Sequence, residues 1–172
     1  ANAKFGPLYE KFAGQDVAEL AKNPEALAIG QKLFLNNCAQ CHASDAAGSR
    51  GFPNLTDNDW LYGGDPATIK ATITEGRNGI MPPFGPVLGD EGVKDAAHYV
   101  MSLSGLTHDS LLAVKGKAVF AANCVACHGA EGKGNAALGA PNLTDKVWLY
   151  GGGETIISET IRAGRNNKMP AW

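Results

Sequence analysis

Apolar residues recur at intervals of three and four along much of the chain, which is the period of helices that bury one face. The pattern predicts a helix that is capped by Asn23 and has Pro24 at its first position. It predicts further helices over 66–75 and 90–104, and another that begins at Ser110. Because no stretch shows the period of two that a strand needs, the pattern predicts an all-α fold without a sheet.

The helix predicted over 90–104 has a clear apolar face. Gly105 is expected to end it, and 105–109 form a short linker. Met101 falls in this helical pattern and is expected to belong to the core. The residues expected to face inward are Val93, Ala97, Val100 and Met101, with Tyr99 beside them.

The chain contains an internal repeat. Four cysteines and their flanks match at a spacing of 86 residues, and the following loops match at 88. The repeat predicts two tandem modules, over 23–105 and 106–172, after a lead-in over 1–22. Matching segments are Pro53-Asn54-Leu55-Thr56-Asp57 with Pro141-Asn142-Leu143-Thr144-Asp145, Trp60-Leu61-Tyr62-Gly63-Gly64 with Trp148-Leu149-Tyr150-Gly151-Gly152, Gly76-Arg77-Asn78 with Gly164-Arg165-Asn166, and Met81-Pro82 with Met169-Pro170.

The motif Cys-x-x-Cys-His occurs once in each repeat and uses every cysteine in the chain. This pattern is typical of covalent c-type haem attachment, in which two thiols bind one porphyrin and the histidine is the proximal iron ligand. We therefore predict two haem c groups. The residues that would hold them are Cys38, Cys41 and His42 in the first copy, and Cys124, Cys127 and His128 in the second.

Other interpretations of the cysteines are weaker. Paired zinc knuckles usually lie about 15 to 20 residues apart, whereas these pairs lie 86 residues apart. A disulfide within each pair would join thiols too close in sequence for a comfortable structural bridge. A thioredoxin-like site should lie in a βαβ pattern, and the flanks here are helical and rich in glycine.

Each repeat also holds one methionine before a proline, about forty residues after its histidine. Met81 and Met169 follow stretches rich in glycine and asparagine, so we expect them on loops stiffened by proline. A thioether and an imidazole together suit an electron-transfer haem. Order along the chain pairs His42 with Met81 and His128 with Met169 as axial iron ligands.

Charge and hydropathy exclude some classes. The formal net charge is −2, with eight Lys/Arg against twelve Asp/Glu over 1–105 and seven against five over 106–172. No basic stripe suggests nucleic acid. No apolar run approaches the length of about 18 residues that a membrane helix needs. Because such haems are attached outside the bacterial cytoplasm, we expect a periplasmic protein whose export signal or membrane anchor lies upstream.

The repeated units resemble tandem class I cytochromes c, and more closely the periplasmic dihaem portion of subunit III of cbb3-type cytochrome c oxidases. The residues of the repeated segments carry this resemblance, which covers about 150 of the 172 residues. The resemblance implies that the carbonyls of Pro53 and Pro141 accept hydrogen bonds from His42 and His128. It makes Trp60, Trp148, Arg77 and Arg165 candidates for contact with haem propionates, although core packing is the alternative for the tryptophans.

The same resemblance assigns a helix crossing to Gly30 and Phe34, with Tyr99 as their partner. The second copy has Gly116 and Phe120 at these positions, but nothing after Met169 matches the helix over 90–104. We therefore expect the second module to lack its C-terminal helix and its crossing to have no partner. A further segment of the chain, or another subunit, would cover that face.

The resemblance implies an electron-transfer subunit, not an enzyme on its own. Electrons would pass from a donor cytochrome c through two haems to the monohaem and catalytic subunits of the oxidase, in aerobic or microaerobic respiration. One alternative is a free periplasmic dihaem cytochrome. Others are a dihaem peroxidase, which needs one five-coordinate iron, and a haem-based gas sensor.

Overall fold

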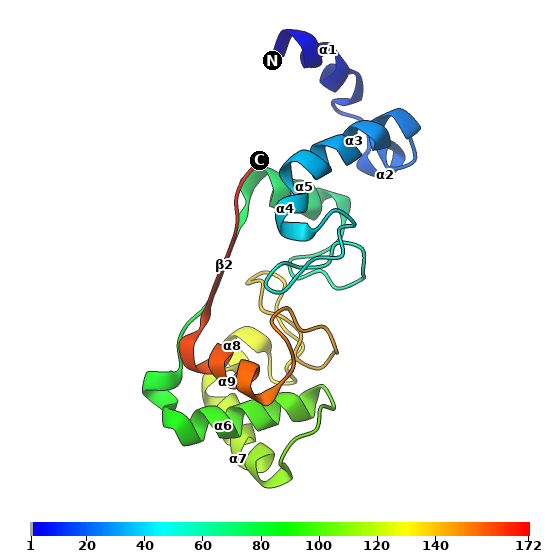
Figure 1. Cartoon of the computed structure of the whole chain (residues 1–172). Coiled ribbons are helices and arrows are strands. Elements are labelled where there is room, and N and C mark those ends of the chain that lie inside the picture. The colour runs from blue at the N-terminus through cyan, green and yellow to red at the C-terminus, as the bar shows by residue number, and fades with distance from the viewer. Residues whose placement is uncertain (1) are drawn as a thin grey trace. The chain divides into compact units, whose positions relative to one another are not determined.

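The chain is predominantly helical. The computed structural model describes residues 2–172, so that only Ala1 of the predicted lead-in lies outside it. Within these residues the helices are α1 (Asn2–Phe12), α2 (Val17–Leu20), α3 (Pro24–Asn37), α4 (Ala39–His42), α5 (Pro66–Glu75), α6 (Gly85–Leu103), α7 (Ser110–Asn123), α8 (Val125–His128) and α9 (Glu154–Ala163). Figure 1 shows them in chain order from blue to red.

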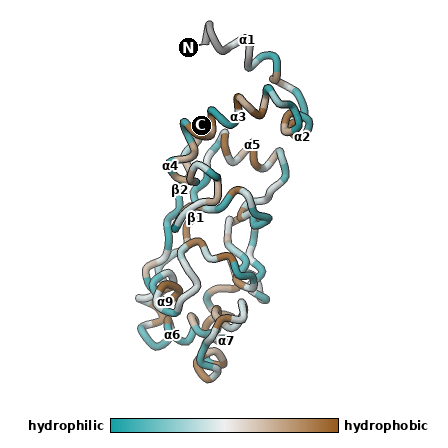
Figure 2. The backbone as a smooth tube through the Cα atoms, turned by 45° about the vertical axis from the view of Figure 1, so that its right-hand side comes forward, coloured by the Kyte–Doolittle hydropathy of each residue, from teal (hydrophilic) through white to brown (hydrophobic). Residues whose placement is uncertain are grey.

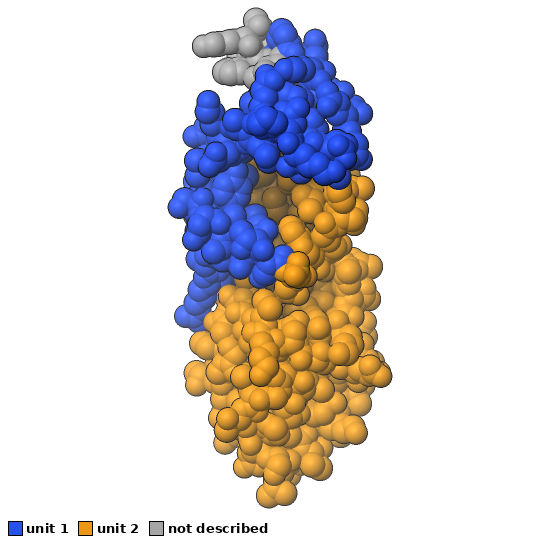
Figure 3. All heavy atoms as spheres, turned by 90° about the vertical axis from the view of Figure 1, so that its right-hand side faces the viewer, with its two compact units in different colours: residues 1–57 blue, residues 58–172 orange. Residues whose placement is uncertain are grey.

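The chain divides into two compact units, over 1–57 and 58–172, which Figure 3 shows in different colours. The first unit contains α1 to α4, and the second contains the remaining elements. These units are defined by packing, whereas the modules predicted to meet between 105 and 106 are defined by the repeat. The predicted module boundaries stay a prediction.

The predicted helix starts are confirmed by their caps. The Asn23 side chain accepts hydrogen bonds from the backbone N–H groups of Glu25 and Ala26, and Pro24 is the first residue of α3. Asp109 caps α7 in the same way, because its side chain accepts from Leu111 and Leu112. These bonds satisfy backbone donors that a helix start leaves without partners.

The expectation of no sheet is wrong. Two strands, β1 (Arg77–Met81) and β2 (Arg165–Met169), form an antiparallel ribbon in which Arg77 lies opposite Met169 and Met81 opposite Arg165. Each strand is five residues long, with only alternate residues partly buried, and the apolar Ile80 of β1 is 66% exposed. Neither segment alternates between apolar and polar residues, which explains why the pattern missed the ribbon.

The hydrophobic core of the second unit lies where α6 packs against α7 and α9. The predicted inward residues of α6 are confirmed, since Val93 and Ala97 are fully buried and Val100 and Met101 are 6% exposed. Phe120 from α7, and Ile157 and Ile161 from α9, complete this core. Figure 2 shows hydrophobic segments in these helices.

The predicted crossing partners are wrong. A Cβ atom at Gly116 would lie 1.9 Å from the Asp95 carbonyl oxygen and 2.9 Å from the Tyr99 Cβ. The Tyr99 and Phe120 rings lie 5.2 Å apart between centroids. α6 therefore crosses α7 of the second repeat, and Tyr99 packs on Phe120. The resemblance implied Phe34 as its partner, but it does not determine which of two similar helices a third one covers.

Candidate haem-attachment sites

Each Cys-x-x-Cys-His motif forms one helical turn at the end of a longer helix. The Cys38 N–H donates to the Phe34 carbonyl at 2.8 Å, which ends α3, and the His42 N–H donates back to the Cys38 carbonyl at 3.0 Å. In the second copy the corresponding bonds, Cys124 to Phe120 and His128 to Cys124, are both 2.9 Å long. Residues three and four apart on a helix share a face, so each turn presents two thiols and an imidazole together.

The histidine side chains are held in one orientation. His42 Nδ1 lies 3.0 Å from the Pro53 carbonyl oxygen, and His128 Nδ1 lies 3.1 Å from that of Pro141. A carbonyl only accepts, so Nδ1 must carry the proton and Nε2 keeps a free lone pair. Both imidazoles are only 8% exposed. The predicted proline contacts are present, and they leave Nε2 as the atom able to bind a metal.

A tight loop brings each proline back over its histidine. The Gly48 N–H donates to the His42 carbonyl at 2.9 Å, and the Gly134 N–H donates to that of His128 at 2.8 Å. Both glycines have positive φ, and a Cβ at either position would lie 2.5 Å from a backbone oxygen of the returning strand. Only glycine allows this close backbone approach.

The electrostatics of the second site are set by burial. Burial lowers the pKa of His128, and the hydrogen bond to Pro141 opposes this shift. Burial, and then the neighbouring Cys127, raise the pKa of the Cys124 thiol. The site therefore favours a neutral imidazole, the form that can bind iron, and a protonated Cys124 thiol before attachment.

The two candidate propionate-binding arginines are oriented in the same way in both repeats. Arg77 Nε donates to Thr72 Oγ1 at 2.9 Å, and the guanidinium lies 4.5 Å from the Tyr62 ring centroid. Arg165 Nε donates to Thr160 Oγ1 at 3.0 Å, and its guanidinium lies 4.2 Å from the Tyr150 ring. A threonine and a tyrosine thus fix the plane of each guanidinium.

These threonines and tyrosines were missed from the sequence. Thr72 and Thr160, like Tyr62 and Tyr150, lie 88 residues apart, which is the spacing of the loop repeat. The repeat was therefore the signal that could have found the threonines. Each threonine lies five residues before its arginine. The threonine is in a helix and the arginine begins a strand, so helical periodicity does not link the two residues.

The candidate tryptophans differ. Trp60 is 36% exposed, whereas Trp148 packs partly buried against the core of the second unit. Trp148 Nε1 is buried and has no hydrogen-bond partner among the described residues. A buried indole N–H without an acceptor costs free energy. An acidic group supplied by a cofactor would satisfy it, and so this atom fits a haem propionate.

The ribbon places the methionines differently from the expectation. Both methionines end strands and do not lie on loops. Met81 packs against the core of the second unit, as do Cys124 and Trp148. Its carbonyl lies against Gly164, at the end of α9, because a Cβ there would be 2.3 Å from that oxygen. Met81 therefore lies with the second repeat.

Met169 occupies the corresponding place beside the first repeat's α5. A Cβ atom at Gly76, which ends α5, would lie 2.6 Å from the Met169 carbonyl oxygen, and the Trp172 N–H donates to the Ile73 carbonyl at 3.0 Å. Because the two strands are antiparallel, Met81 of the first repeat lies at the end of α9, and Met169 of the second repeat lies at the end of α5. The pairing of each histidine with a methionine stays a prediction.

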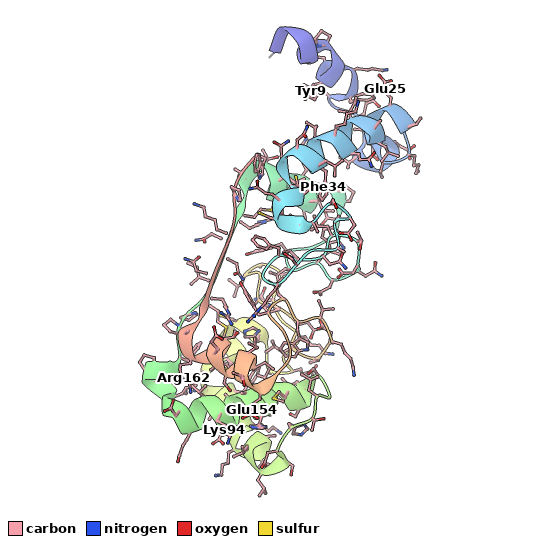
Figure 4. All side chains as sticks on the ribbon, viewed as in Figure 1. Tyr9, Glu25, Phe34, Lys94, Glu154 and Arg162 are labelled. Atoms are coloured by element: carbon pink, nitrogen blue, oxygen red, sulfur yellow. The ribbon has the colours of Figure 1, made fainter. Side chains whose placement is uncertain are left out.

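The other two histidines make contacts of their own. His98 is buried, accepts the Asp109 N–H at 3.0 Å through Nδ1, and has Nε2 3.4 Å from Glu154 Oε1. Figure 4 labels Glu154 on α9. His108 is exposed and its Nδ1 lies 2.7 Å from the Leu106 carbonyl. His98 thus joins α6 to the starts of α7 and α9.

The donor set fits a covalently attached haem. The four cysteines are free thiols, placed in pairs on single helical turns. Each pair adjoins an imidazole whose Nε2 is free to bind, and the second site has an unsatisfied buried indole N–H. A largely helical chain with these features belongs to the class of c-type cytochromes.

The family model for cytochrome c oxidase, cbb3-type, subunit III matches residues 25–100 and 112–172. The chain belongs to this family. It is 56% identical over 172 residues to the cbb3-type cytochrome c oxidase subunit CcoP of Rubrivivax gelatinosus, covering 99% of the chain and 56% of that protein. It is 46% identical over 183 residues to subunit FixP of Sinorhizobium medicae, covering 99% and 63%.

A third relative is subunit CcoP of Cereibacter sphaeroides, 40% identical over 180 residues, with 96% of the chain and 62% of that protein covered. The chain thus spans between 56% and 63% of the length of these relatives. None of the helices in residues 2–172 combines the length and apolar character needed to cross a membrane.

Proposed function

We propose that the chain transfers electrons through two covalent c-type haems to the catalytic subunits of a cbb3-type oxidase. The observation that carries the proposal is the pair of helical turns in which two thiols adjoin an imidazole with Nδ1 bonded to a proline carbonyl, at 3.0 and 3.1 Å. The relatives are named as subunits of this oxidase, which supports the assignment to the complex.

Cysteine, histidine, arginine and tryptophan side chains would each hold a different part of the haem. Cys38 and Cys41, and likewise Cys124 and Cys127, would form thioethers, while His42 and His128 would ligate iron through Nε2. When bound, the haem supplies an iron that cycles between the ferrous and ferric states. Arg165 and Trp148 would donate to propionate oxygens at the second site, and Arg77 and Trp60 are the candidates from the first repeat.

The methionines would complete the coordination in crossed order. Met81 lies with Cys124 and Trp148 around one core, so its thioether would bind the iron held by His128. Met169 remains as a candidate iron ligand. Two protein ligands on each iron leave no position for oxygen or peroxide, and a thioether ligand keeps the potential relatively high.

Nuclear magnetic resonance of the reduced holoprotein tests this crossed order. A methionine methyl bound over a haem is shifted strongly upfield by the porphyrin ring current. The Met81 methyl should show this shift and nuclear Overhauser contacts to the porphyrin bonded to Cys124. Met101, which is buried in the core and is 6% exposed, provides the control methyl with no such shift. Contacts from Met81 to the porphyrin bonded to Cys38 would contradict the crossed order.

The proposed setting is the periplasmic side of the bacterial inner membrane, with an anchor in the full-length protein. The partners would be a donor cytochrome c and the monohaem and catalytic subunits. Rapid mixing of the assembled oxidase with reduced donor cytochrome c should reduce the c-type haems before the catalytic haems. Peroxide turnover by the half-reduced chain, or reduction of the catalytic haems first, would contradict the proposal.

A further inference from the structure

α7 has a buried side and an exposed side, and both carry apolar residues. Ala113, Gly116 and Phe120 are buried where α6 packs against α7. On the other side, Leu111 is 75% and Val114 is 74% exposed, which are the highest values among the exposed large hydrophobic residues of the described chain. Residues three apart share a face of a helix, so these two side chains lie together in contact with water. The exposed side of α7 is therefore apolar without being part of the core.

Two lysines flank these apolar side chains. Lys115 and Lys117 are exposed, and neither forms a salt bridge with another described residue. α7 contains no Asp or Glu that could neutralise them. With about 3.6 residues per turn, the two lysines lie at opposite edges of the exposed side. We call this surface the outer patch of α7, and its residues are Leu111, Val114, Lys115, Lys117, Ala118 and Ala121.

The corresponding helix of the first repeat does not carry such a patch. At the spacing of 86 residues, α3 has the same inward glycine and phenylalanine as α7. Its outward positions differ, because Leu111 corresponds to Glu25 and Ala118 corresponds to Lys32. The positions that match the two lysines hold isoleucine and glutamine. Since both copies have the haem motif, haem attachment does not require the outer patch, and the patch indicates a role of the second repeat alone.

The outer patch adjoins the second haem-attachment turn. α7 ends at Cys124, which also precedes the helical turn α8. Ala121 precedes Cys124 by one helical turn, which is a rise of about 4.5 Å along the helix axis. Cys127, on the attachment turn itself, is exposed. A protein bound to the outer patch would therefore lie near a porphyrin attached to these cysteines.

We propose that the outer patch of α7 is the docking surface for the electron donor, a soluble redox protein whose docking face has carboxylates around a small apolar centre. Leu111 and Val114 would be buried against that centre, while Lys115 and Lys117 would face the carboxylates. The surrounding charge has the matching sign, because residues 106–172 carry seven Lys/Arg against five Asp/Glu. The inference rests on the proposed electron-transfer function, and it adds where the donor binds and what chemistry its surface has.

An anionic membrane is the other kind of surface that a basic amphipathic helix contacts. The segments that bind anionic lipids usually contain about four to eight Lys/Arg residues, whereas α7 contains two lysines and no arginine. The small charge of α7, together with the small apolar area between its lysines, favours a protein partner over a lipid surface.

Stopped-flow reduction of the holoprotein by a reduced, soluble c-type cytochrome of acidic isoelectric point tests the electrostatic part. In Lys115→Glu/Lys117→Glu the second-order rate constant at low ionic strength should fall by about tenfold or more, and the difference should shrink at high salt. Lys32→Glu/Lys70→Glu is the matched control, because it changes the net charge equally at exposed lysines outside the outer patch. Equal rate constants for the two double variants would overturn the proposal.

Leu111→Ser/Val114→Ser tests the apolar part. This variant should bind the same cytochrome more weakly by about tenfold or more, as measured by a titration of amide resonances. Val87→Ser, on α6, changes a valine that is 73% exposed and should bind as the wild type does. Binding to phosphatidylglycerol vesicles that the double serine variant loses, with its binding of the cytochrome unchanged, would assign the outer patch to the membrane and overturn the proposal.

Reduction by a small neutral reductant separates this inference from the proposed function. All variants should be reduced equally by it, since none of them alters a haem-attachment residue. Failure of the wild type to accept electrons from this reductant would contradict the proposed electron-transfer function. Normal reduction by it, with no difference among the variants in their rates with the acidic cytochrome, would overturn the docking surface alone.

Discussion

At the scale of single residues, the two histidine loops differ where the backbone turns back. Ala43 and Ala46 have φ values of 63° and 60°, and they are the described residues other than glycine with positive φ. The corresponding residues of the second copy are Gly129 and Gly132, with φ of 75° and 71°. Ala43 also has ψ of 162°, a combination that suits only glycine. The first loop therefore holds backbone strain that the second avoids.

Replacing these alanines should stabilise the first loop. We expect Ala43→Gly and Ala46→Gly each to raise the free energy of unfolding by about 1 kcal/mol, because glycine adopts positive φ without a steric cost. Guanidinium unfolding of the holoprotein, monitored at the haem absorbance, measures this. Gly129→Ala is the matched control and should destabilise the protein by a similar amount. Destabilisation by Ala43→Gly would show that the loop is not strained.

At the scale of elements, the crossing of α6 over α7 is the contact most sensitive to side-chain size. Gly116→Ala places a methyl group 1.9 Å from the Asp95 carbonyl oxygen, so the helices must separate. We expect a loss of about 2 to 3 kcal/mol, as for overpacking in a core. Thermal unfolding of the holoprotein tests this.

Gly30→Ala is the matched change on the uncovered copy. Its methyl group would meet no atom within 4 Å, and alanine has the higher helix propensity by about 1 kcal/mol. We therefore expect unchanged or slightly higher stability in the chain over 1–172. Equal destabilisation by the two substitutions would contradict the difference between the two faces.

Much of the element scale could be predicted from the sequence. The cap at Asn23 and the apolar face of α6 are local features, and local features fix helix starts and inward faces. α9 was not predicted, although Ile157 and Ile161 have helical spacing, because Gly153 at its start provides no side-chain cap. The ribbon of β1 and β2 joins segments 88 residues apart, and such pairing leaves no local signal.

At the scale of the whole molecule, the repeat could be read from the sequence. That α6 of the first repeat packs against α7 of the second could not. The repeat positions of Met81 and Met169 suggested that both are iron ligands. The residues that surround each methionine depend instead on the antiparallel register of β1 and β2. For the same reason Tyr99 was assigned to the wrong helix. When two copies share one pattern, each element fits two places, and only the packing decides between them.

Because the buried core lies in one unit, we expect the two units to differ in stability when no haem is attached. Of the described residues, the buried hydrophobic ones all lie within 93–161, in the second unit, and none lies within 1–57. Protein without attached haem should therefore keep slow hydrogen exchange in α6 and α7, while the amides of α3 exchange at close to the rates of an unfolded chain. Exchange measured on the variant with all four cysteines replaced by alanine tests this. Equal protection of both units would show that the first does not depend on haem for its core.

The central claim is that the chain carries two six-coordinate c-type haems that exchange electrons. A spectroscopic redox titration of the full-length protein under carbon monoxide, with the haem content determined on the same sample, tests it most directly. The predicted result is two one-electron components of c-type spectrum, of equal amplitude, with no carbon monoxide adduct at neutral pH. A single component amounting to one haem per chain, or an adduct on either reduced haem, would contradict the claim.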